Sequence, residues 1–277
     1  MVGGESQQAP TAREGSSEGS SVSIDANSFH WTSASRSHPG RVRQVNEDAC
    51  LDQSEHGLWA VADGMGGHSL GELASGLAVQ SLMGLPAAED LEQRVAVALD
   101  CLQEVNRHLR AEALRREVPL IGTTIAALLA AGGLCSCLWA GDSRIYLFRA
   151  GRLKQLTRDH SGFEVARSRR VSRSDDTVER PQTNLITRAL GAEDTLYIDR
   201  VNIELRDGDI FLLCTDGLSN EVSELSIKQA LLPGICGLAC DALIDMALGR
   251  EARDNITAVV VRAEDLRSPD RTILRVL

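Results

Sequence analysis

Three aspartates stand where predicted β-strands begin or end. Asp63 follows the apolar run LWAVA and precedes Gly64, whose carbonyl can turn to lie beside the carboxylate. Asp216 follows the run IFLLCT in the same way, and Asp254 comes shortly before the β-branched run ITAVVV. A single Asp-Gly pair is an ordinary turn signal. If these strands end together in one sheet, the three carboxylates lie within a few ångströms of one another.

Adjacent carboxylates repel one another, so three of them cannot all stay ionised in contact without a cation between them. Ligation by oxygen alone, without His or Cys, selects hard ions such as Mg²⁺ or Mn²⁺ over zinc. Further acids occupy similar positions: Glu47 and Asp48 in VRQVNEDA, shortly after Arg43, and Asp142 in WAGDSR. These residue types predict a centre for hard divalent cations.

The elements that position these acids are short apolar runs bounded by turns. Strands are predicted at Gly57–Ala62, Thr123–Ala131, Leu134–Ala140, Arg144–Arg149 and Asp209–Cys214. Hairpin turns are predicted at Gly132-Gly133 and Ala150-Gly151. Helical spacing of apolar residues predicts helices at Ser69–Met83, Leu91–Arg116 and Leu238–Leu248. Sequentially paired antiparallel strands with separate helical zones favour a layered α+β fold over an alternating βαβ sheet.

The charge balance excludes several kinds of partner. The 277 residues include 39 acidic and 29 Lys or Arg side chains, a formal net charge of −10, which argues against nucleic acid and anionic membranes. No apolar run is long enough for a membrane span, and the start of the chain lacks the pattern of a signal peptide. The seven cysteines lie mostly in apolar stretches, which suits free thiols in a reducing cytoplasm. Because no helix requires a partner, we expect a cytoplasmic monomer.

Composition divides the chain into three parts. Residues 1–28 predict a disordered tail, residues 29–265 a single folded domain, and residues 266–277 a C-terminal tail. Within the domain, 162–183 is poor in large aliphatic residues and predicts a surface insertion.

A series of motifs then points to one family. RQVNED, ADGMGGH, GTT, GDSR, LTRDHS, NLITRALG, GDIFLLCTDGL and DNITAVVV, in this order from Arg43 to Val261, resemble the metal-dependent Ser/Thr protein phosphatases, the protein phosphatase 2C family, in its compact bacterial form. The resemblance implies a four-layer α/β/β/α sandwich of two antiparallel sheets flanked by antiparallel helices. It also implies hydrolysis of phosphoserine and phosphothreonine in proteins at a two-metal centre between the sheet ends.

The resemblance assigns a role to each acid. Asp63 would bridge two Mn²⁺ or Mg²⁺ ions, Asp216 and Asp254 would complete the first, and the Gly64 carbonyl would assist at the second. The ions would share a water, lower its pKa and direct it in line at phosphorus, so no covalent phosphoenzyme is required.

The remaining matches surround this centre. Arg43 matches the family's phosphate-holding arginine, and its planar guanidinium suits two phosphate oxygens at once. Glu47 and Asp48 would act mainly through metal-bound waters, and Asp142 would help to hold a third, weaker ion. Three more residues are expected to shape the site rather than react: Asp159, Ser161 and Asn255.

Two features leave alternatives open. Eukaryotic members have a His two residues after the bridging Asp, where this chain has Met65, so the general acid is either His68 or a metal-bound water; His68 is equally consistent with a structural role at a helix start. The insertion matches the family's flap, and its arginines either attract acidic or phosphorylated peptides or belong to a solvated loop: Arg167, Arg169, Arg170 and Arg173.

The functional hypotheses differ in class. The first is an active phosphoprotein phosphatase that opposes a bacterial Ser/Thr kinase acting on shared substrates. The second is a catalytically silent member that binds phosphoproteins or regulates a kinase, and a weaker third is a phosphatase for a small metabolite. The complete set of acidic ligands and the intact Arg43 favour the first.

Overall fold

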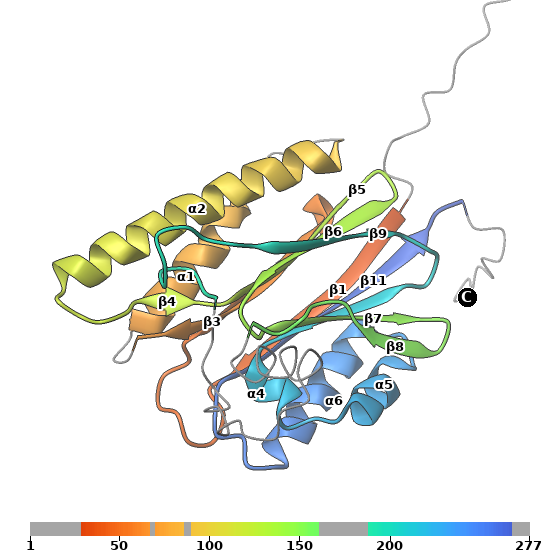
Figure 1. Ribbon diagram of the computed structural model, residues 1–277. Helices are drawn as coiled ribbons and strands as arrows, with labels where there is room; N and C mark the ends of the chain where they lie inside the picture. Colours follow the sequence, from red (N-terminus) through yellow and green to blue (C-terminus); the bar gives the residue numbers. More distant parts are fainter. Residues whose placement is uncertain (1–28, 67–69, 86–89, 161–187, 268–277) are drawn as a thin grey trace, which may run out of the picture.

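The computed structural model describes residues 29–66, 70–85, 90–160 and 188–267. Two antiparallel sheets pack face to face, and helices cover both outer faces, as Figure 1 shows. The predicted α+β sandwich of four layers is therefore confirmed. The predicted tail at 1–28 and the insertion at 162–183 lie outside the described residues, as do residues 268–277 of the predicted C-terminal tail.

The five-stranded sheet has the strand order β1-β11-β10-β7-β8. Its strands are β1 (Phe29–His38), β11 (Ile256–Asp265), β10 (Ile210–Cys214), β7 (Arg144–Arg149) and β8 (Arg152–Gln155). The β-branched run of β11 is buried from Ile256 to Val261, because this strand lies between β1 and β10 and has a packed layer on each side.

The six-stranded sheet has the order β2-β3-β5-β6-β9, with β4 paired to the end of β3. Its strands are β2 (Asp48–Gln53), β3 (Leu58–Met65), β4 (Gly122–Thr123), β5 (Ile125–Ala131), β6 (Leu134–Ala140) and β9 (Asp199–Glu204). The 3-10 helix η1 (Ser54–His56) joins β2 to β3. β5 is apolar throughout because both of its faces are covered.

Two groups of helices cover the sheets. The six-stranded sheet is covered by α1 (Leu70–Met83) and α2 (Leu91–Arg115), and the five-stranded sheet by α4 (Asp216–Ser219), α5 (Glu224–Leu231) and α6 (Cys236–Leu248). Asp90 caps the N-terminus of α2, because its side chain accepts a hydrogen bond from the Glu92 amide. No helix in the described ranges has the length and apolar character needed to span a membrane.

The central core lies between the two sheets. Trp31 of β1 and Trp59 of β3 meet there with ring centroids 4.8 Å apart, beside Phe211 and Val259. Separate apolar layers join each sheet to its helices. All seven cysteines are free thiols, as the sequence predicted.

The sequence predicted most of these elements but not how they pair. The five strands predicted by range, the strand predicted after Asp254 and the three predicted helices are present with small shifts at their ends, and both hairpin turns have positive φ angles. The patterns did not identify β1, β2, β8, β9, α4 or α5. The expectation of sequential pairing is wrong for Leu134–Ala140 and Arg144–Arg149, because the chain crosses from one sheet to the other between them at Gly141, which has a φ of 116°.

Candidate active site

The predicted acids meet at one edge of the sandwich, but they come from both sheets. Asp63 on β3 and Asp48 on β2 are direct partners across their antiparallel pair. Asp216 follows β10 in the other sheet, and Asp254 precedes the neighbouring strand β11. The expectation from strand patterns, that one sheet supplies Asp63, Asp216 and Asp254, is therefore wrong, because face-to-face packing brings the ends of two sheets together.

Asp48 links the two sheets at this edge. Its Oδ2 accepts hydrogen bonds from the hydroxyls of Thr215, at 2.8 Å, and Thr257, at 2.7 Å. The Thr257 amide in turn donates to the Thr215 hydroxyl at 3.0 Å. These contacts hold one carboxylate oxygen of Asp48 in place and leave its Oδ1 buried without a hydrogen-bond partner.

The GTT and GDSR motifs hold the backbone of Asp63. The Asp63 amide donates to the Thr124 hydroxyl, and the Asp63 carbonyl accepts from the Thr124 amide, both at 2.9 Å. The Thr123 hydroxyl also donates to this carbonyl at 3.0 Å. Because Thr124 and Ser143 share a hydrogen bond of 2.7 Å between their hydroxyls, the Asp142 turn is connected to the same network.

Gly64 and Glu47 form the contact between the acid edge and α1. The Gly64 amide donates to the Glu47 carbonyl at 3.1 Å, and Glu47 Oε1 accepts from the Gly71 amide at 3.2 Å. A Cβ atom on Gly64 would lie 2.0 Å from the Gly71 carbonyl oxygen, so only glycine fits there. One oxygen of Glu47 therefore has a structural role that the sequence did not predict.

Burial and mutual repulsion disfavour the charged forms of these acids. Burial raises the pKa of Asp48 to about 7, and the charges of Asp216 and Asp254 contribute to the rise. Burial also raises the pKa of Asp142 to about 7, and the charge of Asp216 makes the largest further contribution to the rise. The pKa values of Asp63 and Asp216 are likewise raised, first by burial and then by neighbouring carboxylates. In this arrangement the cluster has an excess of negative charge that it does not neutralise itself.

The unpaired oxygens at this edge fit a hard cation. Asp48, Asp142 and Asp216 each have a buried Oδ1 atom with no hydrogen-bond partner, whereas buried polar atoms normally have one. Carboxylate oxygens are the ligands that Mg²⁺ and Mn²⁺ prefer. No three His, Cys, Asp or Glu side chains in the described part of the chain form a ready-made metal cage. The support for a cation is therefore the set of open acceptors together with their like charges.

Arg43 reaches this edge from the loop between β1 and β2. Its Nη2 atom lies 3.0 Å from Asp254 Oδ2, and both side chains are about half exposed, at 50% and 41%. The structure thus places the predicted phosphate-holding arginine beside one of the predicted metal ligands, on the solvent side of the cluster.

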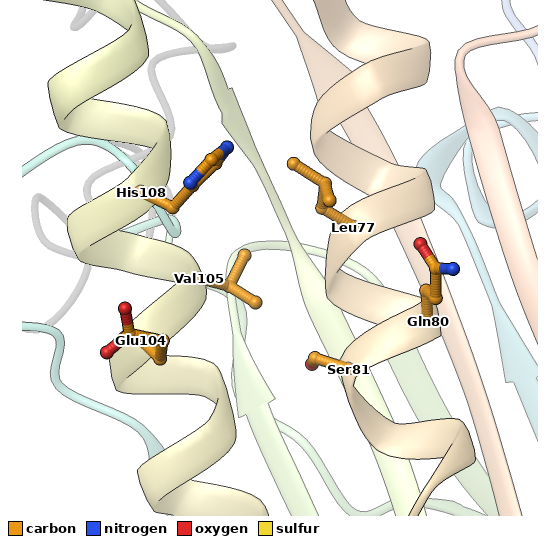
Figure 2. A pocket seen from close by; sticks show the side chains of 6 residues that line it. All are labelled: Leu77, Gln80, Ser81, Glu104, Val105 and His108. Carbon is orange, nitrogen blue, oxygen red and sulfur yellow. The ribbon is translucent and has the colours of Figure 1, made fainter.

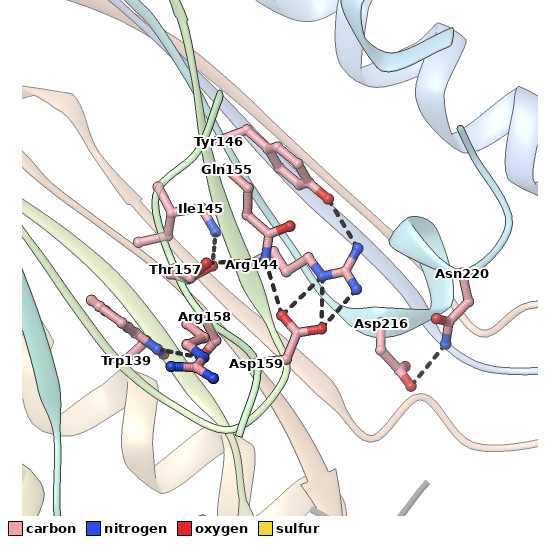
Figure 3. Close-up of polar contacts among 10 residues, drawn as sticks. All are labelled: Trp139, Arg144, Ile145, Tyr146, Gln155, Thr157, Arg158, Asp159, Asp216 and Asn220. Carbon is pink, nitrogen blue, oxygen red and sulfur yellow. Dashed lines mark hydrogen bonds and ion pairs between the residues drawn. The ribbon is translucent and has the colours of Figure 1, made fainter. Parts of the chain in front are cut away.

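A second arginine near the cluster was not predicted from the sequence. Figure 3 shows Arg144 on β7 paired with Asp159: the Nε–Oδ1 distance is 3.0 Å and the Nη2–Oδ2 distance 2.7 Å. Gln155 also donates to Asp159 at 3.0 Å. The positive charge of Arg144 lowers the pKa values of Asp142 and Asp216, which partly offsets the effect of burial. The only signal for this residue was its place in the GDSR motif, which does not identify its partner.

The structure brings eight of the predicted site residues to this edge: Arg43, Glu47, Asp48, Asp63, Gly64, Asp142, Asp216 and Asp254. Asn255 and Asp159, predicted to shape the site, lie beside them. Six further predicted residues lie outside the described ranges: His68, Ser161, Arg167, Arg169, Arg170 and Arg173.

A pocket of about 260 Å³ lies elsewhere, between α1 and α2 (Figure 2). Its lining residues are Leu77, Gln80, Ser81, Glu104, Val105 and His108. None of them belongs to the acid edge, so the candidate site is defined by its chemistry and not by this pocket.

Comparison with known proteins decides the family. The family model for protein phosphatase 2C matches residues 36–238. The chain belongs to the protein phosphatase 2C family. It is 36% identical over 236 residues to the serine/threonine protein phosphatase PstP of Mycobacterium tuberculosis, covering 84% of this chain and 45% of that protein. The chain thus spans about half the length of this relative.

Solved structures of the family agree with the fold. PppA, a key regulatory component of T6SS in Pseudomonas aeruginosa, is 41% identical with a TM-score of 0.79, covering 84% of this chain and 98% of that chain. The catalytic domain of PstP in complex with two manganese ions is 33% identical with a TM-score of 0.75. The match covers 86% of this chain and 100% of that chain. The resemblance found in the sequence motifs and the sandwich it implied are both confirmed.

Proposed function

We propose that the chain hydrolyses phosphoserine and phosphothreonine in proteins, using Mn²⁺ or Mg²⁺ held at the acid edge. The observation that carries this proposal is the set of three buried, unpartnered carboxylate oxygens at the acid edge, where the half-exposed guanidinium of Arg43 contacts Asp254. Asp63, Asp216 and Asp254 would hold two ions with the Gly64 carbonyl, and Asp142 would hold a third, weaker ion. Glu47 and Asp48 would act through water. When bound, these ions supply activation of water and neutralisation of phosphoryl charge.

Asp63 is the residue we place at the centre of this cluster. Both threonines of the GTT motif hold its backbone by hydrogen bonds. The position from which its side chain extends is therefore fixed near the end of β3. Such preorganisation matters because catalysis by positioned charge depends on groups that do not have to reorganise during the reaction.

Arg43 would bind two oxygens of the phosphate through its planar guanidinium. In the structure its Nη2 group faces Asp254, so a phosphate at the acid edge would take the place of a carboxylate as its partner. The half-exposed position of Arg43 suits a phosphate that arrives from solvent on a protein segment.

The partners we propose are phosphorylated proteins and a Ser/Thr kinase whose substrates the chain shares. The name of the relative PstP, a serine/threonine protein phosphatase, supports this substrate class. The four flap arginines, Arg167, Arg169, Arg170 and Arg173, are proposed to attract such substrates. Replacing all four with Ala is expected to lower efficiency toward phosphopeptides and not toward a small aryl phosphate.

The test of the proposed function is Mn²⁺-dependent release of phosphate from a phosphothreonine peptide. We expect turnover by the wild type and none by Asp216→Ala. The matched control is Asp241→Ala, which removes an exposed acid from α6 and is expected to leave turnover unchanged. If the wild type shows no turnover with either Mn²⁺ or Mg²⁺, the proposal is wrong.

A further inference from the structure

The loop that carries Arg43 has no regular structure of its own. It runs from Pro39 to Glu47 and crosses from β1 in the five-stranded sheet to β2 in the six-stranded sheet. Because neither helix nor strand hydrogen bonds hold this crossing, the position of Arg43 depends on contacts that other residues make with the loop.

Asn255 makes these contacts at three points. Its Oδ1 accepts a hydrogen bond from the Glu47 amide at 2.8 Å, and its Nδ2 donates to the carbonyls of Pro39 and Val45, each at 3.0 Å. The residue is 5% exposed. A single buried amide thus binds the start, the later part and the end of the loop, and Arg43 lies between the first two of these points.

The backbone around Asn255 brings the same loop close to Asp254. Gly40 has a φ of 80°, and a Cβ atom there would lie 2.2 Å from the Asp254 carbonyl oxygen. The Arg41 amide donates to the Ala252 carbonyl at 2.8 Å. The Asn255 amide donates to Asp254 Oδ1 at 2.9 Å, so Asn255 contacts both the Arg43 loop and the partner of Arg43.

We propose that Asn255 is a positioning residue that holds the Arg43 guanidinium beside the metal-binding edge and thereby determines how well the phosphate group is bound. It acts through the loop and does not touch the reacting atoms. This inference rests on the proposed function, in which Arg43 holds the phosphate. An amide suits the role because it offers an acceptor to one backbone group and two donors to two others.

The decisive experiment is a double-mutant cycle between Asn255 and Arg43, measured as kcat/KM for a phosphothreonine peptide with Mn²⁺. Asn255→Ala is expected to lower kcat/KM roughly ten- to a hundredfold, mainly through KM, because a misplaced binding group loses effective contact with its substrate. In the Arg43→Ala background the same change is expected to have almost no further effect. Independent, multiplicative effects of the two substitutions would overturn the proposal.

Asn106 provides a matched control. It is a fully buried asparagine of α2 that binds another loop, accepting from the Gly191 amide at 2.7 Å and donating to the Glu193 carbonyl at 3.0 Å. Asn106→Ala removes the same kind of contact without touching the Arg43 loop. Its effect on kcat/KM is expected to be equal in the wild-type and Arg43→Ala backgrounds.

Two readouts do not depend on turnover. Hydrogen exchange of the Glu47 amide is expected to be faster in Asn255→Ala, because that amide loses its acceptor. The Kd for Mn²⁺, measured by titration calorimetry, is expected to stay at the wild-type value. A fall in Mn²⁺ affinity that matches the fall in kcat/KM would show that Asn255 acts on Asp254 instead, and would overturn the proposal. Asn255→Ser serves as the second variant should the alanine variant fold poorly.

The outcomes separate this inference from the proposed function. A wild type that releases no phosphate contradicts the proposed function itself. An active wild type, an impaired Arg43→Ala variant and independent effects of Asn255→Ala contradict only the positioning role of Asn255.

Discussion

The two ends of β10 carry aspartates in opposite surroundings. At the start of the strand, the Asp209 side chain is fully buried and accepts two hydrogen bonds of 2.6 Å from Arg149 and one of 2.8 Å from the Arg206 amide. At the other end, Asp216 receives one bond of 3.2 Å from Asn220 and has a buried Oδ1 without a partner. Burial and the charge of Asp254 raise the pKa of Asp216.

This difference separates a residue that pairs its charge within the fold from a residue that we propose holds a metal ion. A buried carboxylate stabilises a protein only when its charge is paired and its oxygens are hydrogen-bonded, as in Asp209. The acid edge leaves its carboxylates close together and partly unpaired, so it costs stability unless a cation neutralises them. Each prediction below changes one side of this comparison.

The largest effect is expected for Asp63→Asn. Phosphate release is expected to fall by about a thousandfold or more, since a carboxylate central to the proposed metal site is lost. Without added metal, the variant is expected to unfold at a higher temperature than the wild type, because repulsion with Asp48 and Asp216 is removed. Phosphate assays and thermal unfolding in a chelator measure the two effects. A lower unfolding temperature would show that Asp63 stabilises the metal-free fold.

At the start of β10, Asp209→Asn is expected to lower the free energy of unfolding by about 2–4 kcal/mol, because Arg149 then loses its buried, charged partner. Urea unfolding monitored by tryptophan fluorescence measures this change. The Kd for Mn²⁺ and the turnover of the folded fraction are expected to match the wild type. A loss of Mn²⁺ affinity would mean that the two ends of β10 are not independent.

The pH dependence of the metal-free protein tests the acid edge without catalysis. A carboxyl group whose pKa is higher in the folded than in the unfolded state binds protons more tightly when folded. Asp142, raised from 3.8 to about 7, therefore reduces stability progressively as the pH rises through this range. Between about pH 5 and pH 7.5, Asp142→Asn is expected to lose less stability than the wild type.

Thermal unfolding across this pH range, in a chelator, makes the comparison. Asp241→Asn, which changes an exposed acid, is the control and is expected to follow the wild type. Mn²⁺ is expected to raise the wild-type unfolding temperature more at the higher pH, where the acids are ionised. Equal slopes for Asp142→Asn and the wild type would contradict the raised pKa of Asp142.

The smallest change in stability is expected for the exposed ion pairs. Arg36 pairs with Asp241 as Arg43 pairs with Asp254, and all four side chains are 41–51% exposed. Arg36→Ala and Arg43→Ala are each expected to change the free energy of unfolding by less than about 1 kcal/mol. Only Arg43→Ala is expected to impair phosphate release. A large loss of stability in Arg43→Ala would indicate that Arg43 holds the fold together as well.

The sequence predicted the acids of the candidate site because their local patterns carry the information. Asp63 and Asp216 follow buried apolar runs, and Asp254 stands before a β-branched one, so each position follows from its neighbours in the chain. Six strands and three helices were predictable for the same reason, since apolar spacing reflects burial.

The side-chain contacts that complete the edge were not predictable in this way. Asp48 binds Thr257, which is 209 positions away, and Asn255 binds Glu47 across 208 positions. Neither threonine nor asparagine indicates in its own segment which distant partner it will meet. The assignment of each strand to a sheet was unpredictable for the same reason, because the crossing between β6 and β7 is decided by packing and not by alternation.

The position of β11 has a consequence for the order in which the molecule can be completed. β11 is the last strand in the described part of the chain, yet it lies between β1 and β10. β1 pairs with it along its whole length, from Phe29 with Asp265 to His38 with Ile256. β10 can already pair with β7, but β1 and β10 are linked only through β11. While the chain is being synthesised, they therefore stay unconnected until residues 256–265 emerge. The five-stranded sheet and the acid edge therefore cannot close before β11 has been translated.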